Sequence, residues 1–137
     1  MWWLFALGSA VFAALTALFA KTGIKNMDTN LAVAVRTLVI LVFAWAIVLV
    51  RSGTSSIAAI STHNLIFLGL SGITTGLSWL FYFKALETGK LSQVAPVDKL
   101  SLALTIIFSV LFLGESLTLK TALGAACILA GTIIIIL

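Results

Sequence analysis

Five long apolar stretches alternate with short polar ones along the chain. The apolar stretches cover residues 2–20, 30–50, 65–84, 92–113 and 118–137. Each is about 20 residues long, which is the length a helix needs to cross a hydrocarbon core of about 30 Å. The pattern predicts an all-α membrane protein, a bundle of five transmembrane helices in a single domain over residues 1–137. The loops leave no room for a soluble domain.

The first apolar stretch has the features of a membrane span. It begins at Trp2 without a preceding basic segment and runs to Ala20, which is longer than the apolar core of a secretory signal. We therefore expect a first span and not a cleaved signal peptide. Trp2 and Trp3 suit an aromatic anchor at the membrane interface.

Composition supports the same class of protein. The chain is 62% hydrophobic and 9% charged, whereas soluble domains carry about 25% charged residues. Its net charge of +4 is spread over loops and ends without a basic run, which argues against nucleic-acid binding. One side collects Lys21, Lys25, Lys84 and Lys90, and the other Arg51 and Lys120. Since Lys and Arg favour the cytoplasmic side, the N-terminus is expected outside and the C-terminus inside.

Two of the spans carry polar stripes at helical spacing. In the third span the stripe is Ser71, Thr75, Ser78 and Tyr82, with Trp79 beside it, and in the fourth it is Asp98, Ser101, Thr105 and Ser109. Such hydroxyls either bond back to carbonyls of their own helix and pack helices, or they line an aqueous cavity. Two stripes favour the lined cavity.

Charged residues also lie inside the spans, where each costs roughly 2.5–3.5 kcal/mol near a helix centre. Arg36 either extends to the headgroups or lines a pathway. Asp98 and Lys99 are consecutive, so on a helix their side chains diverge by about 100°. We expect them to meet partners on other helices or water. Pro96 removes a backbone donor and favours a bend just before them.

Nothing in the sequence indicates an enzyme. His63 is the single histidine and Cys127 the single cysteine, so neither a nucleophile–base pair nor a metal cluster is recognisable. No glycine-rich nucleotide loop is present either. We expect no catalytic residues, no metal and no cofactor.

Several short motifs together resemble one transporter family. They are Tyr82-x-x-Ala85-Leu86-Glu87-x-Gly89, Val94-Ala95-Pro96, Leu113-Gly114-Glu115-x-Leu117-Thr118, and the later Gly124 and Gly131. In this order they resemble the EamA domain of the drug/metabolite transporter superfamily, a pattern that Arg36 also fits. The resemblance implies one half of a ten-helix inverted-repeat transporter, since most members carry two such domains. It also implies export or exchange of small polar metabolites across the cytoplasmic membrane.

The single domain shapes the expected mechanism. An odd number of spans gives two tandem copies opposite orientations, as in inverted-repeat transporters. We therefore expect a multi-pass transporter of small polar metabolites or drug-like solutes in the cytoplasmic (inner) membrane, surrounded by lipid. It would act as a homodimer, antiparallel in one version, or as a heterodimer with a related subunit. The chain lacks the first-span glutamate of the similarly sized small multidrug resistance proteins, so their proton-coupled antiport is not expected.

The candidate substrate pathway gathers the polar, aromatic and helix-bending positions of spans two to four. It comprises Arg36, Ser71, Thr75, Ser78, Trp79, Tyr82, Pro96, Asp98, Lys99, Ser101 and Thr105. Two other functions stay open. One is a non-transporting accessory or lipid-linked-sugar flippase subunit of a hetero-oligomeric complex, and the other is a structural membrane protein whose charges only set helix register.

Overall fold

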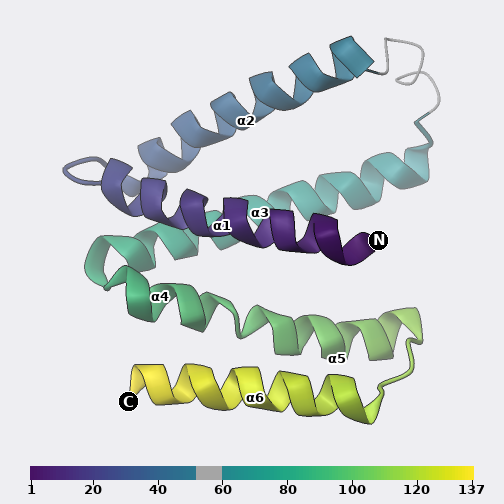
Figure 1. Ribbon diagram of the computed structural model, residues 1–137. Helices are drawn as coiled ribbons and strands as arrows, with labels where there is room; N and C mark the ends of the chain where they lie inside the picture. The colour runs from purple at the N-terminus through teal and green to yellow at the C-terminus, as the bar shows by residue number, and fades with distance from the viewer. Residues whose placement is uncertain (52–59) are drawn as a thin grey trace. The chain divides into compact units, whose positions relative to one another are not determined.

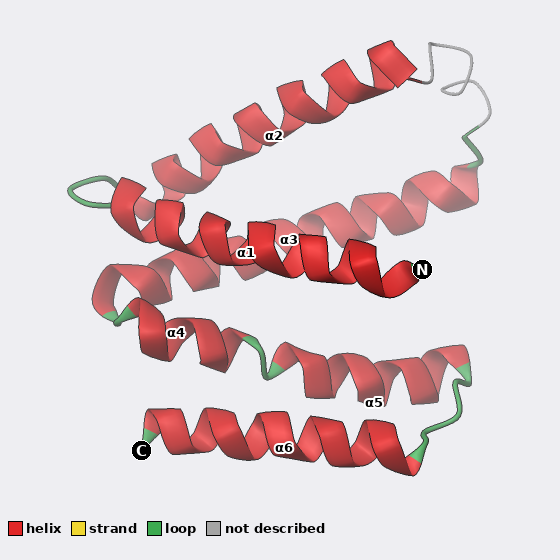
Figure 2. Cartoon of the chain, in the orientation of Figure 1, coloured by secondary structure: helices red, strands yellow, loops and turns green. Residues whose placement is uncertain are grey.

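The computed structural model describes residues 1–51 and 60–137, and within them the regular structure is helical (Figure 2). The helices are α1 (Trp2–Gly23), α2 (Thr29–Arg51), α3 (Thr62–Thr88), α4 (Leu91–Asp98), α5 (Ser101–Leu113) and α6 (Leu119–Ile136), as Figure 1 shows.

The helices make five stretches that are long and apolar enough to cross a membrane. Four of these are α1, α2, α3 and α6, and the fifth is Leu91–Leu113, which combines α4 and α5. Large apolar side chains such as Phe43 and Phe81 are 67% and 78% exposed, as expected for surfaces that meet lipid. The predicted fold class is therefore confirmed: the chain is an all-α, multi-pass membrane protein.

The third helix is longer than the predicted span. It continues to Thr88, past the predicted end at residue 84, so Glu87 lies in its last turn and not in a loop after the predicted span. The apolar face of the helix also continues, because Leu86 is fully buried, with 0% of its surface exposed. The extra turn of α3 thus carries a buried side chain.

The fourth span is broken where it was predicted to be continuous over residues 92–113. α4 ends at Asp98 and α5 begins at Ser101. The N–H of Lys99 donates to the carbonyl of Pro96 at 3.0 Å, and the N–H of Leu100 to that of Val97 at 3.0 Å. These i to i+3 bonds tighten the chain into a turn. Pro96 lies within α4 and disrupts its hydrogen bonding, so the predicted bend is present as a break just after it.

The chain forms two compact units, which are described separately. The first, here called the α4–α6 unit, contains residues 1–17 and 88–137. In it α6 packs against both α4 and α5 (Figure 1). Thr132 of α6 is buried, and its hydroxyl donates to the Pro96 carbonyl at 3.4 Å and to the Ile128 carbonyl at 2.9 Å. α6 thus contacts α4 beside the break in the fourth span.

The second unit, here called the α2–α3 unit, contains residues 18–87. Its buried apolar side chains are Ile24, Ala32, Val33, Phe83 and Leu86. They come from the segment after α1, the start of α2 and the end of α3. Because lipid is as apolar as these side chains, close packing and polar contacts, not removal from water, hold such an interface together.

Candidate functional site

Arg36 is held on aromatic rings at the interface of α2 and α3. Its guanidinium carbon lies 4.1 Å from the centre of the Trp79 ring and 5.5 Å from that of Phe83. Such contacts contribute roughly 0.5–1 kcal/mol when exposed and about 2 kcal/mol when desolvated. The side chain is half-buried. The two rings therefore offset part of the cost of placing this cation inside a span.

The position of Arg36 follows from the antiparallel register of α2 and α3. Thr29 at the start of α2 bonds Glu87 at the end of α3. Arg36, seven residues later on α2, meets Trp79, eight residues earlier on α3. Seven residues correspond to about two turns, or roughly 10 Å of helix. Arg36 thus lies well inside the span and not at its end.

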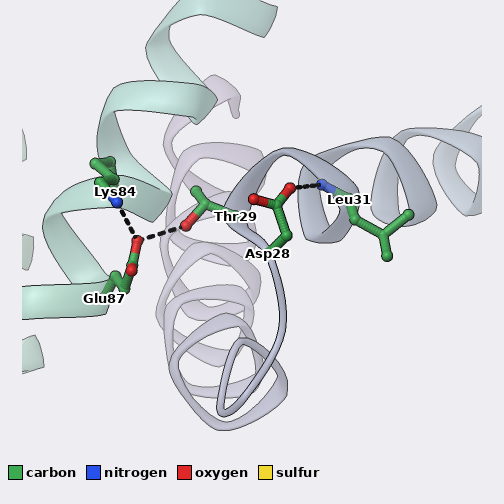
Figure 3. Close-up of polar contacts among 5 residues, drawn as sticks. All are labelled: Asp28, Thr29, Leu31, Lys84 and Glu87. Carbon is green, nitrogen blue, oxygen red and sulfur yellow. Dashed lines mark hydrogen bonds and ion pairs between the residues drawn. The ribbon is translucent and has the colours of Figure 1, made fainter.

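A polar cluster lies at the end of this unit where Thr29 and Glu87 meet (Figure 3). One carboxylate oxygen of Glu87 accepts from the Thr29 hydroxyl at 2.7 Å and from the Lys84 ammonium at 2.7 Å. Beside it, Asp28 accepts from the N–H of Leu31 at 3.0 Å, which caps the start of α2. The cluster joins α2 to α3.

The last turn of α1 is tied to the same end of α3. The ammonium group of Lys21 donates to the backbone carbonyl of Leu86. Sequence reasoning missed Glu87, Thr29 and Phe83 as contact residues. Glu87 stands inside one of the motifs that resemble the EamA domain, but the predicted third span ended at residue 84, before it. Neither Thr29 nor Phe83 carries a signal that local spacing can detect.

The hydroxyl stripes bond within their own helices where contacts are seen. Thr75 donates to the carbonyl of Ser71 at 2.7 Å, and Thr105 to that of Ser101 at 2.8 Å. Ser109 donates to the carbonyl of Ile106 at 3.0 Å. A hydroxyl that donates in this way keeps lone pairs for a second partner. The bonds are therefore compatible with helix packing and with a lined cavity.

Asp98 and Lys99 pair with each other. The Lys99 ammonium lies 3.4 Å from a carboxylate oxygen of Asp98, and the two side chains are 54% and 36% exposed. The expectation that the two side chains diverge is wrong. It assumed a continuous helix, whereas α4 ends at Asp98 and Lys99 lies in the turn that follows, from which its flexible stem reaches back to the carboxylate.

The predicted pathway residues fall into two groups, one in each compact unit. Arg36, Ser71, Thr75, Ser78, Trp79 and Tyr82 belong to the α2–α3 unit, and Pro96, Asp98, Lys99, Ser101 and Thr105 to the α4–α6 unit. Within the first group the structure joins Arg36 to Trp79. Within the second, it gathers Pro96, Asp98 and Lys99 around the break between α4 and α5.

No metal site is found in the part of the chain that the structure describes. Across residues 1–51 and 60–137, no three His, Cys, Asp or Glu side chains gather closely enough to hold an ion. Cys127 on α6 is a free, exposed thiol. The contacts described at the candidate site are ion pairs, hydrogen bonds and aromatic contacts.

Comparisons with known proteins point to one family. The profile described as the EamA-like transporter family matches residues 1–137. A protein of Sinorhizobium sp named "uncharacterized transporter in cobO 3' region" is 47% identical over 134 residues, which is 98% of this chain and 95% of that relative. An uncharacterized protein of Methanocaldococcus jannaschii is 35% identical over 66 residues, 48% of each chain. No solved structure matches. The coverage shows that the Sinorhizobium relative has nearly the same length as this chain.

Proposed function

Because the chain belongs to the EamA-like transporter family, we propose that it exports or exchanges small polar solutes across the cytoplasmic membrane as a dimer. The observation that carries this proposal is Arg36, a cation about two turns inside a span and stacked on Trp79. Charged residues at membrane depth characteristically serve a pathway or cavity. The hydroxyls of Thr75 and Ser78, near Trp79 on α3, supply further polar groups for a solute.

The break in the fourth span is a second polar region, within the α4–α6 unit, that supports the proposed transport function. Irregular backbone at membrane depth is tolerated where it lines a cavity or is buried in protein, and transporters place binding sites at such discontinuous helices. Here the break carries the Asp98–Lys99 ion pair. Ser101 and Thr105 follow on α5. We assign Asp98 the role of a proton or cation acceptor, and Lys99 that of its counter-charge.

The number of spans supports the proposed dimer. The described residues of the chain contain five candidate spans, which is an odd number. Two copies inserted in opposite orientations would reproduce the inverted arrangement in which substrate binds between two repeats. The orientation that we propose has the N-terminus outside and the C-terminus inside, which the positive-inside bias supports. A related second subunit in the opposite orientation would serve the same purpose.

Counterflow across proteoliposomes tests the proposal. Purified protein is reconstituted in liposomes preloaded with unlabelled amino acids, sugars, monocarboxylates or nucleosides, and entry of the labelled solute is followed. We expect wild type to exchange at least one class, and folded Asp98→Asn to lose at least tenfold of the rate. Glu115→Gln is the control, because it removes a carboxylate from the segment between α5 and α6.

If the purified protein alone transports no solute, a different role is indicated. If wild type moves no solute and a second membrane protein copurifies with it in a fixed ratio, the chain is an accessory or lipid-linked-sugar flippase subunit. Transport at the wild-type rate by Asp98→Asn would remove that residue from the pathway.

A further inference from the structure

We propose that Arg36, stacked on Trp79 and Phe83, is the receptor for the carboxylate of a small anionic solute. The inference rests on the proposed transport function and names the class of substrate. The guanidinium of Arg36 has no carboxylate paired with it in the described part of the α2–α3 unit. Burial of such a cation is unfavourable unless an anion pairs with it for at least part of the working cycle.

Both carboxylates of the α2–α3 unit are engaged elsewhere. Asp28 accepts from the N–H of Leu31, and Glu87 accepts from Thr29 and Lys84. Among the described residues of this unit, neither forms an ion pair with Arg36. The residues outside the description, 52–59, contain no acid. The α2–α3 unit therefore supplies no carboxylate counter-ion to Arg36.

The contacts with the Trp79 and Phe83 rings orient the Arg36 guanidinium for binding a planar anion. Contacts of 4.1 Å to the Trp79 ring and 5.5 Å to the Phe83 ring restrict the guanidinium, whose N–H donors all lie in its own plane. A carboxylate accepts two parallel bonds from such an edge, which adds geometric selectivity to charge attraction. Because the rings have already immobilised the long side chain, less conformational entropy is lost when the anion binds.

The depth of Arg36 favours a solute over a lipid headgroup. The residue lies roughly 10 Å along α2 from Thr29, whereas Lys21 and Lys84 belong to the end of the unit where Thr29 and Glu87 meet. Those lysines are better placed for phosphates at the membrane surface. On α3, Thr75 and Tyr82 lie about one turn before and after Trp79 and offer hydroxyls for the remainder of a polar solute.

Equilibrium binding to the full chain in phosphatidylcholine nanodiscs tests this assignment. The probes are benzoate, acetate and succinate, and benzamide is the neutral match for benzoate. We expect wild type to bind benzoate at least tenfold more tightly than benzamide. Arg36→Gln should weaken benzoate binding at least tenfold and leave benzamide unchanged. Arg51→Gln, which removes a cation from the end of the same helix, should bind benzoate as wild type does.

A second variant separates the loss of carboxylate binding from the loss of folding. Arg36→Lys keeps the charge in the span but lacks the planar donor edge, so we expect it to fold and to bind benzoate more weakly than wild type. Helical circular dichroism and a monodisperse elution profile establish folding for each variant.

Three results would overturn the inference. They are equal benzoate binding by wild type and Arg36→Gln, no saturable binding of any of the three carboxylates, and Arg36-dependent capture of phosphatidylglycerol with none of the carboxylates. The last would show that Arg36 serves a lipid phosphate. Transport of carboxylate solutes that Arg36→Gln leaves unchanged would refute this inference alone, whereas liposomes in which wild type moves nothing would refute the proposed function.

Discussion

The guanidinium carbon of Arg36 lies 4.1 Å from the centre of the Trp79 ring, across the interface of α2 and α3. This contact is in register with the hydrogen bond between Thr29 and Glu87 at the end of the same two helices. A charge that membrane-insertion energetics disfavour is thereby placed on an aromatic face. On the proposed function, stability and recognition depend on the same pair of residues.

The first prediction concerns the energy of this pair. In a double-mutant cycle, Arg36→Met and Trp79→Leu should show a coupling of about 0.5–2 kcal/mol, because each substitution alone removes the same cation–π contact. Reversible unfolding in mixed micelles measures the free energies. The control cycle pairs Arg51→Met with Trp79→Leu, since Arg51 lies at the far end of α2. Coupling no larger in the first cycle than in the control would contradict the contact.

The second prediction ranks two bonds to Glu87. Thr29 is 7% exposed, whereas the Lys84 side chain is 67% exposed. A buried hydrogen-bonding partner is more costly to lose than one arm of an exposed ion pair. Thr29→Val should therefore lower the melting temperature more than Lys84→Met, as followed by circular dichroism in detergent. The reverse order would show that the ion pair, not the hydroxyl, joins α2 to α3.

The third prediction concerns Pro96. Pro96→Ala restores a backbone donor inside α4 and removes a ring that disfavours the helix, so α4 and α5 should become more continuous. Spin labels at residues 91 and 113, in a Cys127→Ala background, should separate toward about 33 Å, the length of a straight helix of that many residues. Counterflow should fall at least tenfold if the break belongs to the pathway.

Two outcomes of that experiment would count against the account. An unchanged label distance would show that packing against α6, and not Pro96, maintains the break. A straightened helix with wild-type transport would show that the break has no part in moving solute. Leu102→Ala, on α5 beyond the turn, controls for nonspecific effects of substitution.

The fourth prediction concerns orientation in the membrane. Two kinds of reporter are fused to the C-terminus, one that is active only inside the cell and one that is active only outside. If oppositely inserted copies pair, both kinds of fusion should be active. Adding lysines to the segment after α3, next to Lys90, should shift the population toward the orientation with that segment inside. A single orientation that added lysines do not change would favour a related partner subunit over an antiparallel homodimer.

The five spans were predictable from sequence because the bilayer imposes a length on every apolar helix. The bend near Pro96 was predictable for a similar local reason, since proline cannot donate its backbone hydrogen bond. The exact position of the turn was not predictable, because the i to i+3 bonds at Lys99 and Leu100 depend on the backbone conformation of the chain after Pro96. That turn also pairs Asp98 with Lys99, which a continuous helix would have separated.

The contacts between helices were harder to predict from the sequence. Arg36 was recognisable from its place in an apolar stretch, and Trp79 from its place beside a polar stripe. That the two meet depends on the register of α2 against α3, which no local pattern contains. The same holds for Thr29 and Glu87, where the extra turn of α3 had first to be known. The pathway grouping itself stays a prediction.

The central claim is that the polar positions of α2 and α3 face a water-filled path through the membrane, and thiol accessibility tests it most directly. In a Cys127→Ala background, cysteine replaces either Thr75 on the polar stripe or Ile73, which lies about 200° around the same helix at nearly the same depth and is 63% exposed. The account predicts that a membrane-impermeant, anionic thiol reagent modifies Thr75→Cys in intact membranes and spares Ile73→Cys. Equal modification of the two positions, or of neither, would contradict it.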